Sequence, residues 1–334
     1  MNEKERLLKA LKGEAVDRPP VICPGGMMNA SVTELLEGFE KNHNTDLASM
    51  VEAACRVHER AGFENLGAPF DMTVEAEPLG ARIDIGGKDI EPRVTEYSEE
   101  AIEVIVNKYN VDPRNERRMN LTLEALSRLK NPQVPVIGNI TGHISTATSV
   151  IDPLVIFKLL RKDPEKAYTF FRFIAGYSQK YAVEMIKAGA DVIVISDPTA
   201  TGEILGSRNF EKFAVPLYKE IIDTIHSFGV PVIVHICGKA ETIIESLNLI
   251  NADALSFDSV VNMRSAKARI NTRMMGNVNT QLLHMGAREK IISITNNCID
   301  SGVDIVSPAC GLSMGTPVRN LQAMTDFVRK GIDG

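Results

Sequence analysis

Residues 230–238 read VPVIVHICG, and this stretch predicts a buried strand with a reactive end. Its β-branched residues are typical of a strand in the interior of a sheet. His235 and Cys237 stand two positions apart at its carboxyl end. In an extended backbone both side chains point to the same side of the strand, so both can reach one metal ion.

A third candidate ligand follows another strand-like run much later in the chain. Cys310 lies in the sequence SPACG, directly after residues 304–307. Glycine follows each cysteine, as Gly238 and Gly311, and lets the backbone turn closely around a site. An isolated buried cysteine is usually a small hydrophobic residue. The matching places of the two cysteines instead favour a His-Cys-Cys set, which suits zinc with one position left open.

The composition is that of an ordinary soluble globular chain and excludes several classes of partner. The 334 residues are 44% hydrophobic and carry a formal net charge of −6. Because no basic stripe is present to neutralise phosphates, nucleic acid is not an expected partner. The five cysteines are odd in number and scattered, which indicates reduced thiols rather than a disulfide framework. The charged start lacks a signal peptide's apolar core and no stretch is as long as a membrane span, so we expect a cytoplasmic protein with no membrane partner.

Strand-like and helix-like segments alternate along the whole chain. We expect strands near 21–23 and 65–68, and at 134–141, 191–197, 230–237, 252–258, 273–279 and 304–310; the clearest helices are expected at 46–61, 164–188 and 209–228. Eight strands separated by helices, with no linker-like segment, predict an α/β fold: a single (β/α)8 TIM barrel that forms one domain over residues 1–334.

Two additions to this barrel are expected, and one alternative fold is compatible with the alternation of strands and helices. An N-terminal helical extension precedes the first strand, and a hairpin excursion at 79–91, with its turn at Gly86-Gly87, follows strand two. An open doubly wound sheet is the alternative. It is less well supported, because no strand is followed by the glycine fingerprint of dinucleotide binding.

Polar residues gather at the predicted strand ends, where the loops of a TIM barrel carry its active site. Besides the three candidate ligands they include Asp71, Asn139, Ser196, Asp197, Asp258, Asn277 and Asn279. Helix capping or turn formation explains Ser196, Asp258 and Asn279 better than a functional role does. For Asp197, which precedes a proline, a turn and a functional role are equally supported.

Several stretches resemble a known family. They are RLLKALKGEAVDRPP at 6–20, HICG at 235–238, MGNVN at 275–279 and DIVSPACGLSMGTPVRNLQAM at 304–324. Together they resemble the uroporphyrinogen decarboxylase superfamily, and more closely its corrinoid-dependent methyltransferase branch. The resemblance implies the same barrel fold, and it implies that His235, Cys237 and Cys310 bind zinc.

For function, the resemblance implies a methyltransferase that takes its methyl group from methylcobalamin on a partner corrinoid protein. Gly25, Gly26, Met27 and Met28 would then form a small, soft lip against the flat corrinoid, although plain packing at the barrel rim explains the two methionines at least as well. Decarboxylation is a less favoured alternative. The parent decarboxylase carries arginines in its first loop for the carboxylates of its substrate, whereas the loop CPGGMMNA at 23–30 has no cation.

The small-molecule acceptor is expected to be tetrahydrofolate, by a slight margin. The loop around Gly25 resembles that of bacterial relatives that methylate tetrahydrofolate. Asp71, Asn139 and Asp197 are available to bind a pterin edge, with Asp197 and Asn139 as candidate catalytic residues and Asn277 as a further substrate-binding candidate. The alternative acceptor is the thiol of coenzyme M, activated by zinc, which the retained ligand set favours. A non-catalytic corrinoid- or folate-binding module is the remaining alternative, and the oligomeric state is not set by the sequence.

Overall fold

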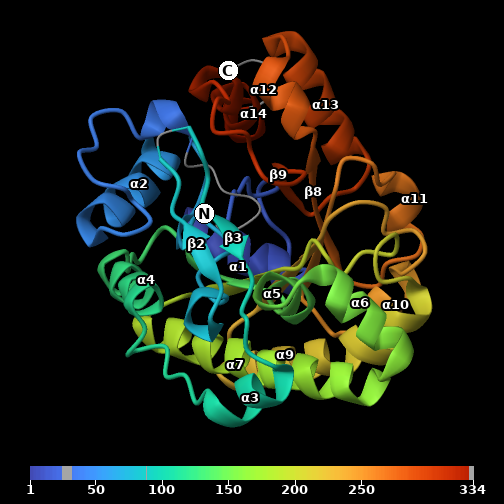
Figure 1. Ribbon diagram of the computed structural model, residues 1–334. Helices are drawn as coiled ribbons and strands as arrows, with labels where there is room; N and C mark the ends of the chain where they lie inside the picture. The colour runs from blue at the N-terminus through green and yellow to red at the C-terminus, as the bar shows by residue number, and fades with distance from the viewer. Residues whose placement is uncertain (25–31, 88, 331–334) are drawn as a thin grey trace.

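A curved sheet of parallel strands, covered by helices, forms the body of the molecule (Figure 1). The computed structural model describes residues 1–24, 32–87 and 89–330. Within these residues the sheet has the strand order β1-β4-β5-β6-β7-β8-β9, and each neighbouring pair is parallel. The bounds are β1 Leu66–Ala68, β4 Val136–Thr141, β5 Val192–Ser196, β6 Val232–Ile236, β7 Ala254–Phe257, β8 Arg273–Val278 and β9 Ile305–Pro308. Seven of the eight predicted strands are therefore confirmed, each slightly shorter than expected.

The first predicted strand is reduced to a single bridge. Val21 pairs with Val306 of β9, and on its other side the Val21 carbonyl accepts a hydrogen bond of 2.8 Å from the Glu64 N–H. The prediction of a full strand here was wrong, because Pro19 and Pro20 supply no amide donors to lengthen the ladder. The segment still lies hydrogen-bonded between β9 and the chain just before β1, so the sheet is TIM-barrel-like.

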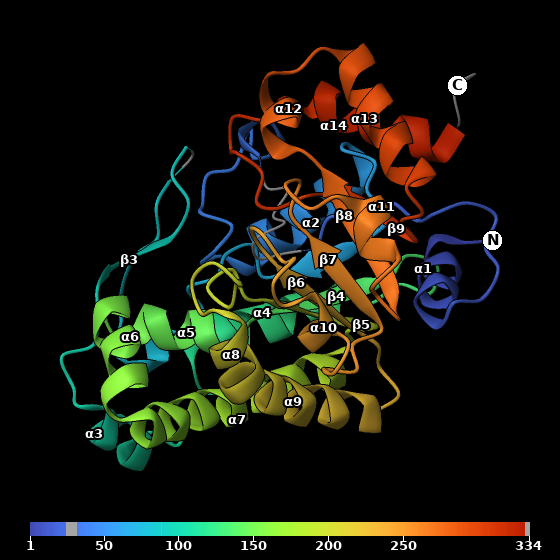
Figure 2. The same ribbon diagram turned by 90° about the vertical axis from the view of Figure 1, so that its right-hand side faces the viewer.

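Helices connect successive strands and cover the outer face of the sheet (Figure 1). They are α2 Leu47–Glu59, α3 Ile102–Lys108, α4 Arg117–Arg128, α5 His143–Val150, α6 Pro153–Lys162, α7 Pro164–Ala188, α8 Ser207–Asn209, α9 Val215–Ser227, α10 Ile244–Leu247, α11 Met263–Lys267, α12 Thr280–Met285, α13 Arg288–Asp300 and α14 Val318–Lys330. α7 and α9 pack side by side, as do α13 and α14 (Figure 2). Across the described ranges no single helix is long and apolar enough to cross a membrane, although the bent pair α5 and α6 passes that test by length and composition.

Local signals in the sequence explain where the longest helix begins and ends. α7 has the predicted bounds, because Asp163 caps its first turn through the Lys166 N–H and Gly189 ends it in a left-handed conformation, with φ of 118°. The helix predicted over 209–228 instead forms in parts: α8 ends at Asn209, a π-helical turn spans Phe210–Ala214, and α9 follows.

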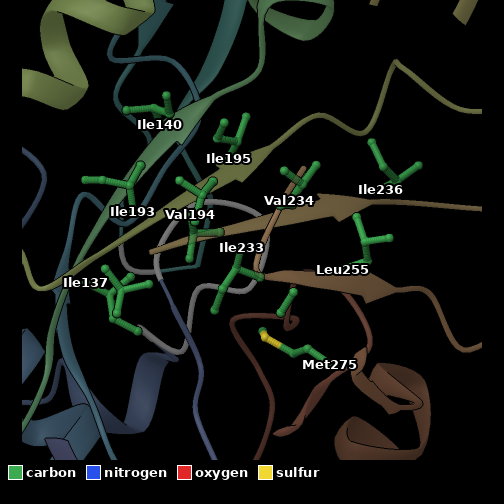
Figure 3. Packing of buried hydrophobic residues seen from close by; sticks show 14 of the residues in the cluster. Ile137, Ile140, Ile193, Val194, Ile195, Ile233, Val234, Ile236, Leu255 and Met275 are labelled. Atoms are coloured by element: carbon green, nitrogen blue, oxygen red, sulfur yellow. The ribbon is translucent and has the colours of Figure 1, made fainter. Parts of the chain in front are cut away.

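Hydrophobic side chains fill both faces of the central strands (Figure 3). Every position of β5 and β6 is buried, and Ile193, Ile195 and Ile233 are fully inaccessible. Such strands show no alternation of polar and apolar residues, because helices cover one face while the other faces the interior of the curved sheet. In β6 the apolar run stops at His235, so the polar residue stands at the carboxyl end of the strand.

Two further elements lie outside the sheet. α1, Glu3–Lys12, forms the N-terminal helix and ends at Gly13 in a left-handed conformation. The strands β2, Arg82–Asp84, and β3, Arg93–Glu96, pair as an antiparallel hairpin that projects from the body of the molecule (Figure 2).

A buried carboxylate ties the N-terminal helix to the edge of the sheet. Glu64 is fully buried; Arg6 of α1 donates to its Oε1 over 2.9 Å and Arg18 over 2.5 Å. The other oxygen accepts a hydrogen bond of 3.0 Å from the Val21 N–H. The segment around Val21, called here the bridge segment, has few backbone hydrogen bonds of its own, so this ion-pair network holds it in place.

A second buried carboxyl joins two loops at the carboxyl end of the sheet. Glu75 follows β1 and is 1% exposed; it accepts hydrogen bonds from the N–H and the hydroxyl of Thr141, over 2.7 and 3.0 Å. Glu75 has no ion pair with any side chain in the described ranges. Burial raises the pKa of Glu75 to about 7, although the bonds from Thr141 act in the opposite direction.

Replacing Glu64 by alanine leaves two guanidinium groups without their shared partner. We expect E64A to lower the free energy of unfolding by about 3–5 kcal/mol, the usual cost of breaking a buried ion pair on one side. Urea denaturation measures the change. E5A is the control, because Glu5 makes only an exposed pair with Lys9 on one helix, and it should leave the unfolding midpoint unmoved. An equal effect of both variants would contradict the role given to Glu64.

Replacing Glu75 by glutamine should make stability less dependent on pH. The folded pKa of about 7 lies above the ordinary 4.5, so the native protein holds this proton more tightly than the unfolded chain. The wild type therefore loses stability as pH rises from 4.5 to about 7, by about 3 kcal/mol in total. E75Q keeps a neutral group, and its advantage over the wild type should grow across that window. Parallel pH profiles of the two unfolding midpoints would disprove this.

Candidate metal centre

The structure brings His235, Cys237 and Cys310 together at the carboxyl end of the sheet. One ligand atom from each lies within 4.8 Å of the others, and the two sulfurs are 3.2 Å apart. His235 belongs to β6 and Cys237 follows that strand, whereas Cys310 follows β9. These strands are not neighbours in the sheet, so its curvature is what brings the cysteines into contact.

The imidazole of His235 is oriented for a ligand. Its Nδ1 lies 3.1 Å from the hydroxyl of Ser256 on β7, while Nε2 is buried and makes no hydrogen bond with any described residue. If Nδ1 carries the proton and donates it to Ser256, Nε2 presents a lone pair. A buried lone pair without a partner costs free energy unless something binds it. Together with two thiols, this nitrogen completes a donor set that fits zinc.

The two cysteine sulfurs share one hydrogen bond, which moves their pKa values apart. The bond to Cys310, together with burial, raises the pKa of Cys237. The same bond lowers the pKa of Cys310, because the thiol of Cys237 stabilises the thiolate it donates to. Of the two thiols, Cys310 is therefore the one that loses its proton more readily. A divalent cation would displace the protons from both sulfurs.

Asp258 is a carboxylate at the same centre, and its role was not found from the sequence. It follows β7, and its Oδ2 lies 3.2 Å from the Cys237 sulfur and 3.1 Å from the Gly238 nitrogen. Burial raises the pKa of Asp258, but the bonds from the Gly238 N–H and from Cys237 outweigh this and lower it. Gly238 has φ of 67°, a left-handed conformation that brings its N–H to the carboxylate. Asp258 also bonds Val260, as the turn former expected from the sequence.

The metal centre opens into a cavity of about 760 Å³. The cavity is lined by Phe70, Asp71, Met72, Glu91, Pro92, Asp258, Thr280, Gln281, His284, Met285, Cys310, Gly311, Leu312 and Ser313. Its walls come from the loop after β1, the end of the hairpin loop, α12 and the loop after β9. No lysine or arginine is among the described residues that line it.

Asp71 lines this cavity, but both of its carboxylate oxygens are engaged. Arg118 of α4 forms a buried ion pair with one oxygen, and Thr73 donates its N–H and its hydroxyl to the other, over 2.8 and 2.5 Å. Arg118 is 47 residues away in sequence, so this pairing carried no sequence signal. Among the described residues Oδ2 accepts only from Arg118, so the substrate-binding role expected for Asp71 stays a prediction.

The other predicted acceptor residues have partners inside the protein. Asp197 is fully buried and accepts hydrogen bonds from the Ser145 N–H, the Ser145 hydroxyl and the Tyr218 hydroxyl, over 2.8, 2.6 and 2.7 Å. It thus caps the first turn of α5. Asn139 accepts a hydrogen bond from Ser196, and the Asn277 amide donates to two backbone carbonyls.

None of these three side chains lines the cavity described above. Their predicted catalytic and binding roles therefore gain no geometric support. Gly25, Gly26, Met27 and Met28, predicted to form a lip, lie outside the described residues.

Comparisons with known proteins place this site in context. The sequence model of the family described as uroporphyrinogen decarboxylase (URO-D) matches residues 2–331. The methylcobamide:CoM methyltransferase MtbA of Methanosarcina acetivorans is 31% identical over 331 residues, and that of Methanosarcina mazei is 30% identical over 330; each alignment covers 98% of this chain and 97% of the relative. A solved structure, a methyltransferase from Methanosarcina mazei, superposes with a TM-score of 0.91 at 26% identity and covers 99% of both chains.

The metal content of purified variants tests the ligand set. We expect about one zinc ion per chain in the wild type, and loss of most of it in H235A, C237A and C310A, because each variant removes one of three protein ligands. Elemental analysis after gel filtration measures the ratio. C55A is the matched control, since Cys55 lies on α2 and outside the cluster. Full zinc occupancy in all three ligand variants would rule this centre out.

Proposed function

The chain belongs to the uroporphyrinogen decarboxylase (URO-D) family, and we propose that it is a corrinoid-dependent methyltransferase that passes a methyl group to a small thiol. The observation that carries the proposal is the convergence of one imidazole and two thiols at one point, beside a cavity that Cys310 lines. The names of the two relatives, methylcobamide:CoM methyltransferases, support the same reaction. The methyl donor is then a methylated cobamide, presented by a corrinoid protein that docks at the cavity mouth.

The charge of the cavity argues against decarboxylation of a porphyrinogen. Such a substrate carries several carboxylates, each of which needs a cation or a set of donors when it leaves water. The described lining has no lysine or arginine, and it contributes three carboxylates of its own, Asp71, Glu91 and Asp258. The proposed reaction reduces this conflict, because the transferred methyl group is uncharged and a small thiol such as coenzyme M carries one anionic group rather than several.

For the acceptor we favour a thiol such as coenzyme M over tetrahydrofolate. The slight preference for tetrahydrofolate at the sequence level is not supported by the relatives, whose names specify coenzyme M. The candidate pterin partners also have other bonds: Asp71 pairs with Arg118, and Asn139 and Asp197 are buried away from the cavity. Asn139 and Asp197 therefore lie away from a folate bound in this cavity, whereas a thiol needs only an open position beside the cysteines.

The residues of the centre divide the work between them. His235, through Nε2, and the sulfurs of Cys237 and Cys310 would hold zinc, and Ser256 fixes the orientation of the imidazole. Bound zinc supplies one thing, a lowered pKa for an added thiol. The carboxylate of Asp258 borders the same end of the cavity, 3.2 Å from the Cys237 sulfur, and the proton that the thiol loses passes to solvent.

The transfer is then an in-line displacement at the methyl carbon. A sulfur lone pair forms the new S–CH3 bond, the Co–C bond breaks, and its electron pair stays with cobalt as Co(I). The cavity brings the sulfur to the methyl carbon and limits the entry of water, and such positioning lowers the barrier without further chemistry by the protein.

Methyl transfer can be followed by the absorbance change of methylcobalamin. With coenzyme M we expect the wild type to convert methylcobalamin to cob(I)alamin. S256A removes the hydroxyl that orients His235 and should lower activity by about 10- to 100-fold. C237A and C310A each remove a metal ligand and should lower activity by more than S256A does. C55A is the control and should keep wild-type activity.

Three outcomes would contradict the proposal. They are turnover with tetrahydrofolate but not with coenzyme M, wild-type rates in C237A, and decarboxylation of uroporphyrinogen.

A further inference from the structure

We infer that His284 is a specificity-determining residue that recognises an anionic group at the far end of the thiol acceptor. The inference rests on the proposed function, because it concerns the acceptor of that reaction. His284 lines the same cavity as Cys310 and Asp258, yet it belongs to α12 and makes no contact with the metal ligands that the structure records. It therefore stands where the end of an acceptor remote from the reacting sulfur would lie.

The wall that carries His284 is rich in hydrogen-bond donors. Gln281 and His284 are three positions apart on α12, so they share one face of the helix, and both line the cavity. Thr280 and Ser313 add hydroxyl groups to the same lining. Amide, hydroxyl and imidazole groups are all able to donate to a sulfonate or carboxylate oxygen.

The His284 imidazole has a nitrogen free to bind a ligand, and the glycine at position 315 leaves room for the ring. Its Nδ1 is buried and has no hydrogen-bond partner among the described residues. Nε2 is not buried in this way and has no recorded hydrogen bond within the same ranges, so it is the nitrogen available to a ligand in the cavity. A Cβ atom at Gly315 would lie 3.1 Å from the His284 Cε1 and 3.9 Å from the Ser313 hydroxyl, so the lack of a side chain there leaves room for both groups. The ring and the hydroxyl thus approach one point of the wall.

The charges of the cavity make this wall the favourable place for an anion. The carboxylates of Asp71 and Glu91 come from other elements, the loop after β1 and the hairpin, and Asp258 lies at the metal end. Asp71 is compensated by Arg118 behind it. His284 is the one lining side chain within the described ranges that is able to carry a positive charge. An acceptor with its sulfur at the cysteines and its anion at α12 avoids repulsion and gains a charge-assisted bond.

The geometry points to a class of acceptor: a short thiol with a sulfonate or carboxylate a few bonds from its sulfur. A neutral thiol of equal length would place its sulfur equally well but would lose the bond to His284. The protein should therefore discriminate between 2-mercaptoethanesulfonate, which is coenzyme M, and 2-mercaptoethanol. The loss of a hydrogen bond to a charged group corresponds to about tenfold or more in binding.

The test measures KM and kcat for both thiols, with methylcobalamin as donor and zinc content recorded for each variant. We expect H284A to raise the KM for the sulfonate about tenfold or more, with kcat and the KM for 2-mercaptoethanol little changed. H284Q keeps a donor without the charge and should give an intermediate KM. R288Q is the matched control, because it removes an exposed positive charge four residues away that does not line the cavity.

The outcomes separate the two proposals. An equal rise of both KM values in H284A and H284Q would show that the imidazole only supports the wall, and unchanged values would show that it does not contact the acceptor. Either result overturns the inference and leaves the methyltransferase proposal intact. A wild type that contains zinc but turns over neither thiol would overturn the proposed function, and the inference with it.

Discussion

The contact between the Cys237 and Cys310 sulfurs, 3.2 Å across 73 positions of the chain, is the constraint on which the candidate site depends. Neither cysteine can move to the other, since each follows a strand buried at every position. The contact therefore exists only because the parallel sheet curves. The curvature depends in turn on the bridge segment and on Glu64, which hold the region between β9 and β1 with few backbone bonds.

The strands around that contact each supply a different part of the site. β6 supplies His235, β7 supplies Ser256 to orient it and Asp258 after its end, and β9 leads to Cys310. Because parallel strands place all their carboxyl ends at one edge, groups from distant parts of the sequence meet without any long loop. The apolar interior below them keeps the strands fixed, so the ligand atoms are preorganised before any ion arrives (Figure 3).

Features with local sequence signals could be predicted from the sequence. Features that depend on pairing between distant residues could not. Side chains alternate between the two faces of a strand, so His235 and Cys237, two positions apart, were predicted to lie on the same side. The apolar run before Cys310 predicted a second strand end. Asp258 could not be separated from a turn former, because an aspartate after a strand looks the same in both roles. The partner of Asp71 is 47 residues away, and no local pattern says which side of a six-residue helix such as α12 faces a cavity. The first strand is reduced to one bridge because Pro19 and Pro20 donate no backbone hydrogen bonds to the ladder.

The electrostatic balance of the site limits which acceptors it accepts. Two thiolates and an imidazole would neutralise a bound divalent ion, so an added thiolate would leave one net negative charge there, and Asp258 would stand beside it with another. A second anion on the same acceptor would be repelled from this end of the cavity. Glu91 repels it from the hairpin side, whereas the charge of Asp71 is compensated by Arg118. Only the wall of α12 and the loop after β9 offers uncharged donors and an imidazole. The negative charge that keeps the sulfur nucleophilic thus also fixes the direction in which the rest of an anionic acceptor must point.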